Sequence, residues 1–109
     1  MTVKTINIAD EFSKVPYGRY PDDGENNGER FRNEFLVPSL NEFEKIIVEL
    51  DGTRGYGSSF LDEAFGGLIR KNIINKENLL SKLEIVSKFE SYKLEIESYI
   101  SEAKPEPLK

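Results

Sequence analysis

The stretch that decides the fold runs from residue 46 to residue 70 and reads IIVELDGTRGYGSSFLDEAFGGLIR. It opens with β-branched residues in a nearly continuous apolar run, which predicts a central strand covered on both faces. A glycine-rich loop follows at residues 51–57. A helix should then begin at Ser58 or Ser59, and either serine could cap it. Apolar residues return in adjacent pairs every four positions, which indicates a helix that buries one side.

The rest of the chain extends this pattern in both directions. We expect strands at residues 2–8 and 82–88, a helix at 29–44 that Pro38 either kinks or divides, and a last helix at 89–103. Strands that alternate with helices predict an α/β fold: one small domain with a mainly parallel sheet and helices packed on it. We place this domain at residues 1–104 and expect residues 105–109 to be a disordered tail.

Residues 12–28 are dense in Pro, Gly, Asn and Asp, which predicts a long loop. Loops of this length are either functional or disordered. Arg19, Arg32 and Arg54 are candidate anion-binding residues, because a planar guanidinium can grip a carboxylate or phosphate. The alternative, which we favour, pairs Arg19 and Arg32 with Asp23, Glu29 or Asp51 to pin the loop. An arginine in a first helical turn opposes the helix dipole, so Arg30 or Arg32 should have a partner elsewhere.

The composition excludes several kinds of chemistry. The 109 residues include no Cys and no His, so this chain alone cannot build a structural zinc site, a haem ligand or a Ser-His-Asp triad. The acidic run near residue 23 lacks the ligand spacing of a calcium loop, so we expect no metal site. We also expect no cofactor and no enzymatic activity. Consecutive Asp62 and Glu63 diverge on a helix, so we interpret both as solvated.

The charge and hydropathy patterns restrict location and partners. The net charge is −5 and the 15 basic residues are scattered, so nucleic acid is not the expected partner. No apolar run approaches the ~18 residues of a membrane span, and the N-terminus lacks the pattern of a signal peptide. We therefore expect a cytoplasmic protein with no membrane contact.

The serine pair is the leading candidate for function. In open α/β sheets, sites form at the carboxyl ends of the strands, which is where Ser58 and Ser59 are expected. A helix start there could accept an anion or a phosphate carried by a serine. The simpler alternative is that the serines only cap the helix. The preceding loop has no lysine before the serines, so it is not a phosphate-binding P-loop.

Several motifs together point to a family. Gly18-Arg19-Tyr20, Asp23-Gly24, Asn27-Gly28-Glu29, Phe31-Arg32 and the string GYGSSFLDEAFGGL at residues 55–68 closely resemble the STAS-like domain family of small bacterial and phage proteins. The resemblance covers roughly residues 6–103. The family is more distantly similar to anti-sigma factor antagonists. In those α/β proteins a serine at a strand-to-helix junction is phosphorylated by an ATPase-kinase partner, and Ser58 or Ser59 matches it by position.

The resemblance implies a regulatory protein-binding module. Residues 52–59 and the following helix would dock a histidine-kinase-type ATPase or another anti-sigma-like regulator, and serine phosphorylation would release it. The expected contact residues are Tyr56, Gly57, Ser58, Ser59, Phe60 and Asp62. Part of the last helix could serve a homodimer. Two alternatives stay open: a receptor or enzyme that binds an anion or nucleotide near Arg19 and Arg32, and a structural subunit of a larger complex.

Overall fold

The computed structural model describes residues 1–108. The strands are β1 (Val3–Asn7), β2 (Lys45–Glu49) and β3 (Leu83–Val86). The helices are α1 (Ile8–Glu11), α2 (Gly28–Phe31), α3 (Val37–Glu42), α4 (Ser58–Leu61), α5 (Gly67–Arg70), α6 (Lys76–Lys82) and α7 (Glu90–Glu102). The chain also forms π-helical turns at Arg32–Leu36 and Asp62–Gly66 and a 3-10 turn at Pro21–Asp23.

The strands form one parallel sheet in the order β1–β2–β3, which makes β2 the central strand. In this register Ile6 lies opposite Val48, and Val48 lies opposite Ile85. The α/β fold with a parallel sheet that the sequence predicts is therefore confirmed. Strands β1 and β3 are shorter than the expected ranges 2–8 and 82–88, and β2 begins one residue earlier than the expected range 46–50.

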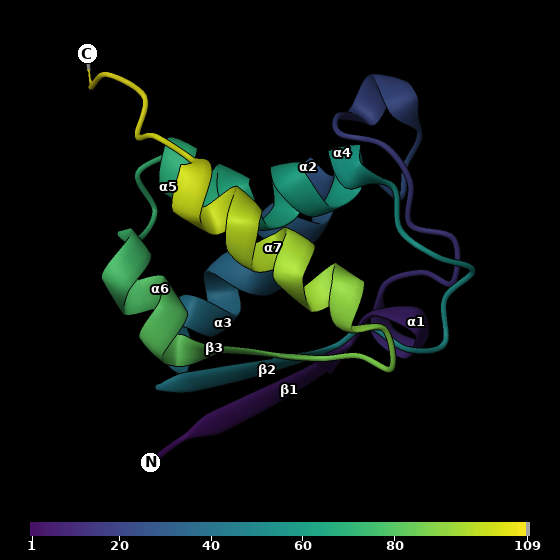
Figure 1. Ribbon diagram of the computed structural model, residues 1–109, viewed down its shortest axis with the longest axis horizontal. Helices are drawn as coiled ribbons and strands as arrows, with labels where there is room; N and C mark the ends of the chain where they lie inside the picture. Colours follow the sequence, from purple (N-terminus) through teal and green to yellow (C-terminus); the bar gives the residue numbers. More distant parts are fainter. Residues whose placement is uncertain (109) are drawn as a thin grey trace.

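The helices cover only one face of the sheet (Figure 1). Along β2, Ile46 and Val48 are buried but Ile47 is only half-buried, because successive side chains of a strand point to opposite faces. The prediction that this strand is covered on both faces is therefore wrong. The uncovered face also carries charged side chains, such as the ion pair of Lys45 with Glu84 at 3.0 Å.

Each of the two central helices is built from shorter pieces. The π turn Arg32–Leu36 joins α2 to α3, and the π turn Asp62–Gly66 joins α4 to α5. Pro38 is the second residue of α3, directly after the π turn, so the proline lies where the expected helix is divided into shorter pieces.

The start of α4 differs from the prediction. Gly57 is the N-cap residue and makes no side-chain hydrogen bond. Ser58 and Ser59 are the first two residues of the helix itself, so the predicted capping role of the serines is wrong.

Helix α6 was not expected, because residues 72–78 interrupt the apolar pattern. Asn75 caps it, since its side-chain oxygen accepts the backbone N–H of Asn78 at 2.8 Å. Beyond α7, the backbone N–H of Glu106 donates to the Arg70 carbonyl at 2.9 Å. Glu106 thus lies against the end of α5.

The core fills the space between the sheet and the helices. Phe31, Phe60 and Phe65 are all 0% exposed, and the Phe31 ring centre lies 5.9 Å from that of Phe60 and 6.4 Å from that of Phe65. These rings bring α2 against the helix that begins with the serine pair. The sequence motif at residues 55–68 is therefore held in place by the core.

Candidate functional site

Ser58 and Ser59 lie where the chain passes from the loop after β2 into α4. Both residues are exposed, and so is Gly57 before them. Tyr17, Gly18 and Asp23 of the long loop line a shallow recess together with these residues. The serine pair is therefore open to another molecule, at the carboxyl edge of the sheet.

Tyr56 anchors the glycine-rich loop. Its hydroxyl donates to the Leu50 carbonyl at 2.6 Å, and its backbone N–H donates to the Tyr92 hydroxyl at 3.3 Å. Burial raises the pKa of Tyr56 to about 12, so its hydroxyl stays protonated near neutral pH. Tyr56 was expected to contact a partner, and these bonds give it a structural role as well, because it fixes the loop that presents the serines.

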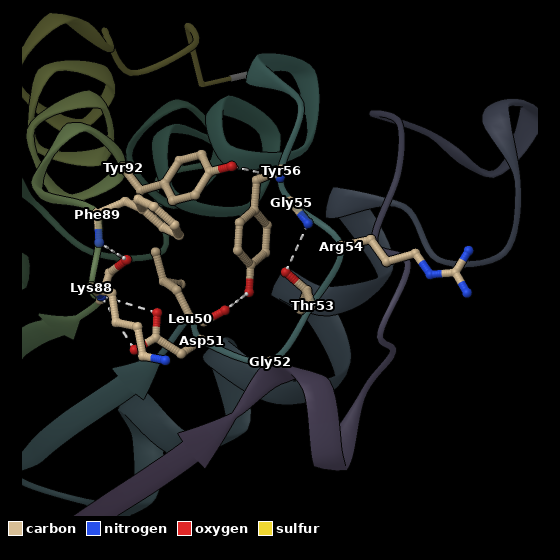
Figure 2. A pocket seen from close by; sticks show the side chains of 11 residues that line it. Leu50, Asp51, Gly52, Thr53, Arg54, Gly55, Tyr56, Lys88, Phe89 and Tyr92 are labelled. Atoms are coloured by element: carbon tan, nitrogen blue, oxygen red, sulfur yellow. Dashed lines mark hydrogen bonds between the residues drawn. The ribbon is translucent and has the colours of Figure 1, made fainter.

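A pocket of about 430 Å³ opens between this loop and the start of α7 (Figure 2). The aromatic rings of Tyr56, Phe89 and Tyr92 form its walls, and Lys88 and Asp51 lie at its edge. Lys88 was not singled out from the sequence, and Phe89 and Tyr92 were expected in the apolar stripe of the last helix, mainly as core residues. Their position follows from the pairing of β3 with β2, which brings the loop after each strand to the same edge of the sheet.

Arg54 is the exposed member of the three candidate arginines. Its backbone N–H donates to the Lys14 carbonyl at 2.9 Å, which ties the glycine-rich loop to the long loop. Its side chain points away from the aromatic walls of the pocket (Figure 2). The guanidinium is therefore free to meet an external partner at the surface.

The other two arginines belong to an ion-pair cluster beside α4. The Arg19 guanidinium lies 2.8 Å from one carboxylate oxygen of Asp62, and the Arg70 guanidinium lies 3.1 Å from the other. Arg32 pairs with Glu63. The cluster therefore joins the long loop to the π turn after α2 and to the π turn after α4.

Arg32 is not an anion-binding residue. Its side chain is 3% exposed, and its guanidinium donates to the carboxylate of Glu63 and, at 3.0 Å, to the Glu63 carbonyl. The prediction that Arg32 binds an external anion is wrong, because the carboxylate of Glu63 already occupies its guanidinium. Glu63 is also buried, so its predicted solvation is wrong. The expectation that Arg30 or Arg32 has a partner elsewhere is confirmed by this pair.

Arg19 fixes the long loop. It binds Asp62 and, at 3.3 Å, Glu63, and its own backbone N–H donates to the Asp23 carboxylate at 2.9 Å. Backbone bonds from Gly28 to Gly18 at 2.9 Å and from Tyr17 to Asn26 at 2.8 Å close the loop. The pinning role that we favoured for Arg19 agrees with these contacts, but its guanidinium pairs with Asp62 and Glu63 instead of the expected Asp23, Glu29 or Asp51.

Two of the expected contact residues need correction. Phe60 is 0% exposed and packs against Tyr56 and Phe31, so it cannot touch a docked partner. Asp62 is only 24% exposed, and both of its oxygens bind arginines. The exposed surface beside the serines is instead extended by Val15 and Tyr17, which are 47% and 68% exposed. Only the folded loop brings these two residues there.

Among residues 1–108, acidic side chains do not gather in threes as ligands for a metal ion. No helix in that range has the length and apolarity needed to cross a membrane.

Comparison with known proteins gives one match. A family model described as "STAS-like domain of unknown function (DUF4325)" matches residues 27–92. The match includes α2, β2, the serine pair, β3 and the first residues of α7. Neither the curated proteins nor the solved structures gave a match.

Proposed function

The chain belongs to the STAS-like domain family, and from this premise we propose that it is a regulatory protein-binding module switched at the serine pair. Its docking surface consists of the exposed residues Val15, Tyr17, Arg54, Gly57, Ser58 and Ser59, and we call it the serine surface. The partner is a histidine-kinase-type ATPase or a related anti-sigma-like regulator. The proposal follows the resemblance to anti-sigma factor antagonists.

The observation that carries the proposal is the exposure of both serines on a rigid support. The residues after them, Phe60 and Leu61, are 0% exposed, so the helix start cannot move independently of the core. The loop before them is held by Tyr56. A kinase can reach the hydroxyl groups, while a docked partner meets a preformed surface.

The surroundings of the serines favour release on phosphorylation. A phosphate adds about two negative charges near neutral pH. Asp62 lies four residues after Ser58 and three after Ser59, which places it beside either serine on the helix. Asp23 lines the same recess. Because Arg19 and Arg70 already bind Asp62, no unoccupied arginine of this cluster awaits the phosphate.

The test measures partner binding by serine variants. The partner is identified by co-purification with the native protein, and intact-mass analysis then reports whether one phosphate is carried at Ser58 or Ser59. Ser58→Asp and Ser59→Asp should weaken binding by about tenfold or more, whereas Ser58→Ala and Ser59→Ala should bind as the parent does. The matched control is Ser91→Asp, at another exposed serine that is the second residue of a helix.

Phosphomimetic variants that bind as tightly as the parent would contradict the switch. If Tyr17→Ala also binds normally, the serine surface is not where the partner docks. If the phosphomimetic variants bind normally but Tyr17→Ala does not bind, the partner does dock on the serine surface. In that case only the proposed phosphorylation step is wrong.

A second candidate function is a receptor for a small anionic or nucleotide ligand, and the pocket beside Tyr92 favours it. Its volume of about 430 Å³ lies within the range of small-molecule sites. The Tyr92 hydroxyl accepts a bond from Tyr56, and its own proton remains available to a ligand. A ligand at 100 times its dissociation constant would stabilise the fold by about 2.7 kcal/mol, which a thermal-shift screen with nucleotides and inorganic phosphate detects. No shift in that screen would reject this candidate.

A further inference from the structure

Strand β3 forms an open edge of the sheet. The Val86 carbonyl accepts the N–H of Leu50 from the β2 side at 2.9 Å. Because backbone groups alternate along a strand, those of Leu83, Ile85 and Ser87 point away from β2. In the described chain, neither the N–H of Ile85 nor that of Ser87 has a hydrogen-bond partner. A free edge of this kind is a template for another strand.

A groove of about 180 Å³ runs beside this edge, between β3 and α7, and both apolar and charged side chains line it. Ile85, Ile96 and Ile100 line its floor. Leu80 of α6, which is 46% exposed, lines the groove. Leu94 of α7, which is 57% exposed, lies three residues before the lining residue Glu97 and so on the same side of the helix. Figure 1 shows β3, α6 and α7 together on the side of the molecule that faces the viewer. The edge and the groove therefore form one continuous surface.

The two charges that α7 places beside the groove are self-complementary, and the third charge there, Glu84, is paired with Lys45 at 3.0 Å. Lys93 and Glu97 both line it from α7 and lie one helical turn apart. When two such helices run antiparallel about a two-fold axis, the lysine of each faces the glutamate of the other. A second copy of this chain therefore meets opposite charges without any change of sequence. An extended peptide would have to supply matching charges of its own.

We propose that a second copy of this chain docks on the β3 edge and forms a two-fold symmetric dimer. The axis passes between the two Ile85 residues, whose backbones exchange two hydrogen bonds as an antiparallel pair. The Ser87 N–H of each copy then donates to the Leu83 carbonyl of the other. The two sheets join into one sheet with β3 strands at its centre, and the α7 helices pack side by side. This surface is separate from the serine surface, so the dimer does not depend on the proposed switch.

The first test measures the oligomeric state by sedimentation over a range of concentrations. The parent should be a dimer that dissociates on dilution, and Leu94→Lys or Leu80→Lys should raise the dissociation constant by about tenfold or more. The matched control is Val3→Lys on β1, which is 46% exposed at the opposite edge of the sheet and should leave the dimer unchanged.

The second test uses charge reversal. Lys93→Glu alone and Glu97→Lys alone each place like charges across the axis, so each variant should be monomeric at concentrations where the parent is a dimer. An equal mixture of the two variants restores both pairs of opposite charges and should form a heterodimer. Failure of the mixture to associate, when each variant is folded, would show that α7 does not pack in this register.

Hydrogen exchange tests the strand pairing without any substitution. The Ile85 and Ser87 amides should exchange slowly in the dimer and rapidly after dilution to the monomer. Unchanged exchange of both amides would overturn the pairing of β3 edges. A parent that stays monomeric at high concentration would overturn the dimer altogether and leave the edge to a different partner.

Discussion

The guanidinium of Arg32 and the carboxylate of Glu63 form an ion pair in which the side chains are only 3% and 2% exposed. The two residues belong to different π-helical turns, 31 positions apart in the chain. The pair therefore connects the two central helices through the inside of the protein. Buried charges of this kind are tolerated only when each has a partner.

Glu63→Gln should destabilise the protein severely. It leaves the Arg32 charge buried without its carboxylate, and breaking a buried pair from one side costs about 3 to 5 kcal/mol. Urea unfolding followed by circular dichroism measures the change. Asp62→Asn is the matched control, because this carboxylate is 24% exposed and its loss should cost no more than about 1 kcal/mol. A double variant, Arg32→Met with Glu63→Leu, should recover much of the loss, and a double variant less stable than Glu63→Gln would contradict this account.

Gly28→Ala should separate α2 from α4. A methyl group at residue 28 would lie 2.6 Å from the Phe60 carbonyl oxygen, and this backbone atom cannot move aside alone. Overpacking of this kind costs about 1 to 3 kcal/mol in unfolding experiments. The control is Gly57→Ser, since a side chain there meets nothing within 4 Å and serine is a good N-cap residue. Equal unfolding midpoints for the two variants would show that Gly28 has no packing role.

The fold could be predicted because its signals are local. The run at residues 46–50 and the apolar pairs after Ser59 indicate a strand and a helix without knowledge of any contact. The prediction that failed was the burial of both faces of β2, because burial depends on which other elements pack against a strand. Ile47 resembles its buried neighbours in sequence, but it faces the side of the sheet that no helix covers.

The charged cluster could not be predicted in the same way. Charged residues in a sequence are usually solvated, so Arg32 and Glu63 gave no sign of burial on their own. One signal did exist in Gly66-Gly67, because a glycine pair within a helix indicates a close approach to another backbone. A methyl group at Gly67 would lie 2.3 Å from the Arg32 guanidinium, so this glycine makes room for the buried arginine. The neighbour of Gly67 is therefore a side chain, whereas Gly66 does lie near a backbone, since a methyl group there would lie 3.4 Å from the Tyr99 carbonyl oxygen.

Acid should loosen the long loop through Asp23. Its carboxylate accepts the backbone N–H groups of Arg19 at 2.9 Å and Tyr20 at 3.2 Å, and these bonds hold the pKa of Asp23 below its ordinary value. A lowered pKa in the folded state means that the carboxylate supports the loop at neutral pH and loses this effect as pH falls through that value, below about pH 4. Amide chemical shifts of Arg19 and Tyr20 should report the titration, and Asp23→Asn should abolish it. An unchanged titration of both amides in Asp23→Asn would assign it to another group.

Alkaline pH should destabilise the protein through Tyr56. Burial raises its pKa from 10.0 to about 12, so the unfolded chain releases the phenolic proton at lower pH than the folded protein does. Stability is therefore retained below about pH 10 and falls as pH rises toward 12. Tyr99, whose pKa burial and its bond to Glu95 also raise to about 12, should contribute to the same slope.

The variant Tyr56→Phe separates these effects. At neutral pH it should cost about 1 kcal/mol, because the Leu50 carbonyl loses its 2.6 Å bond from the hydroxyl. Above pH 10 its free energy of unfolding should fall less steeply with pH than that of the parent. The stabilities of the two proteins should therefore converge as pH rises. Tyr17→Phe, which removes a hydroxyl from a ring that is 68% exposed, is the matched control. If Tyr56→Phe loses stability above pH 10 as steeply as the parent, the Tyr56 hydroxyl is not the group whose ionisation destabilises the protein.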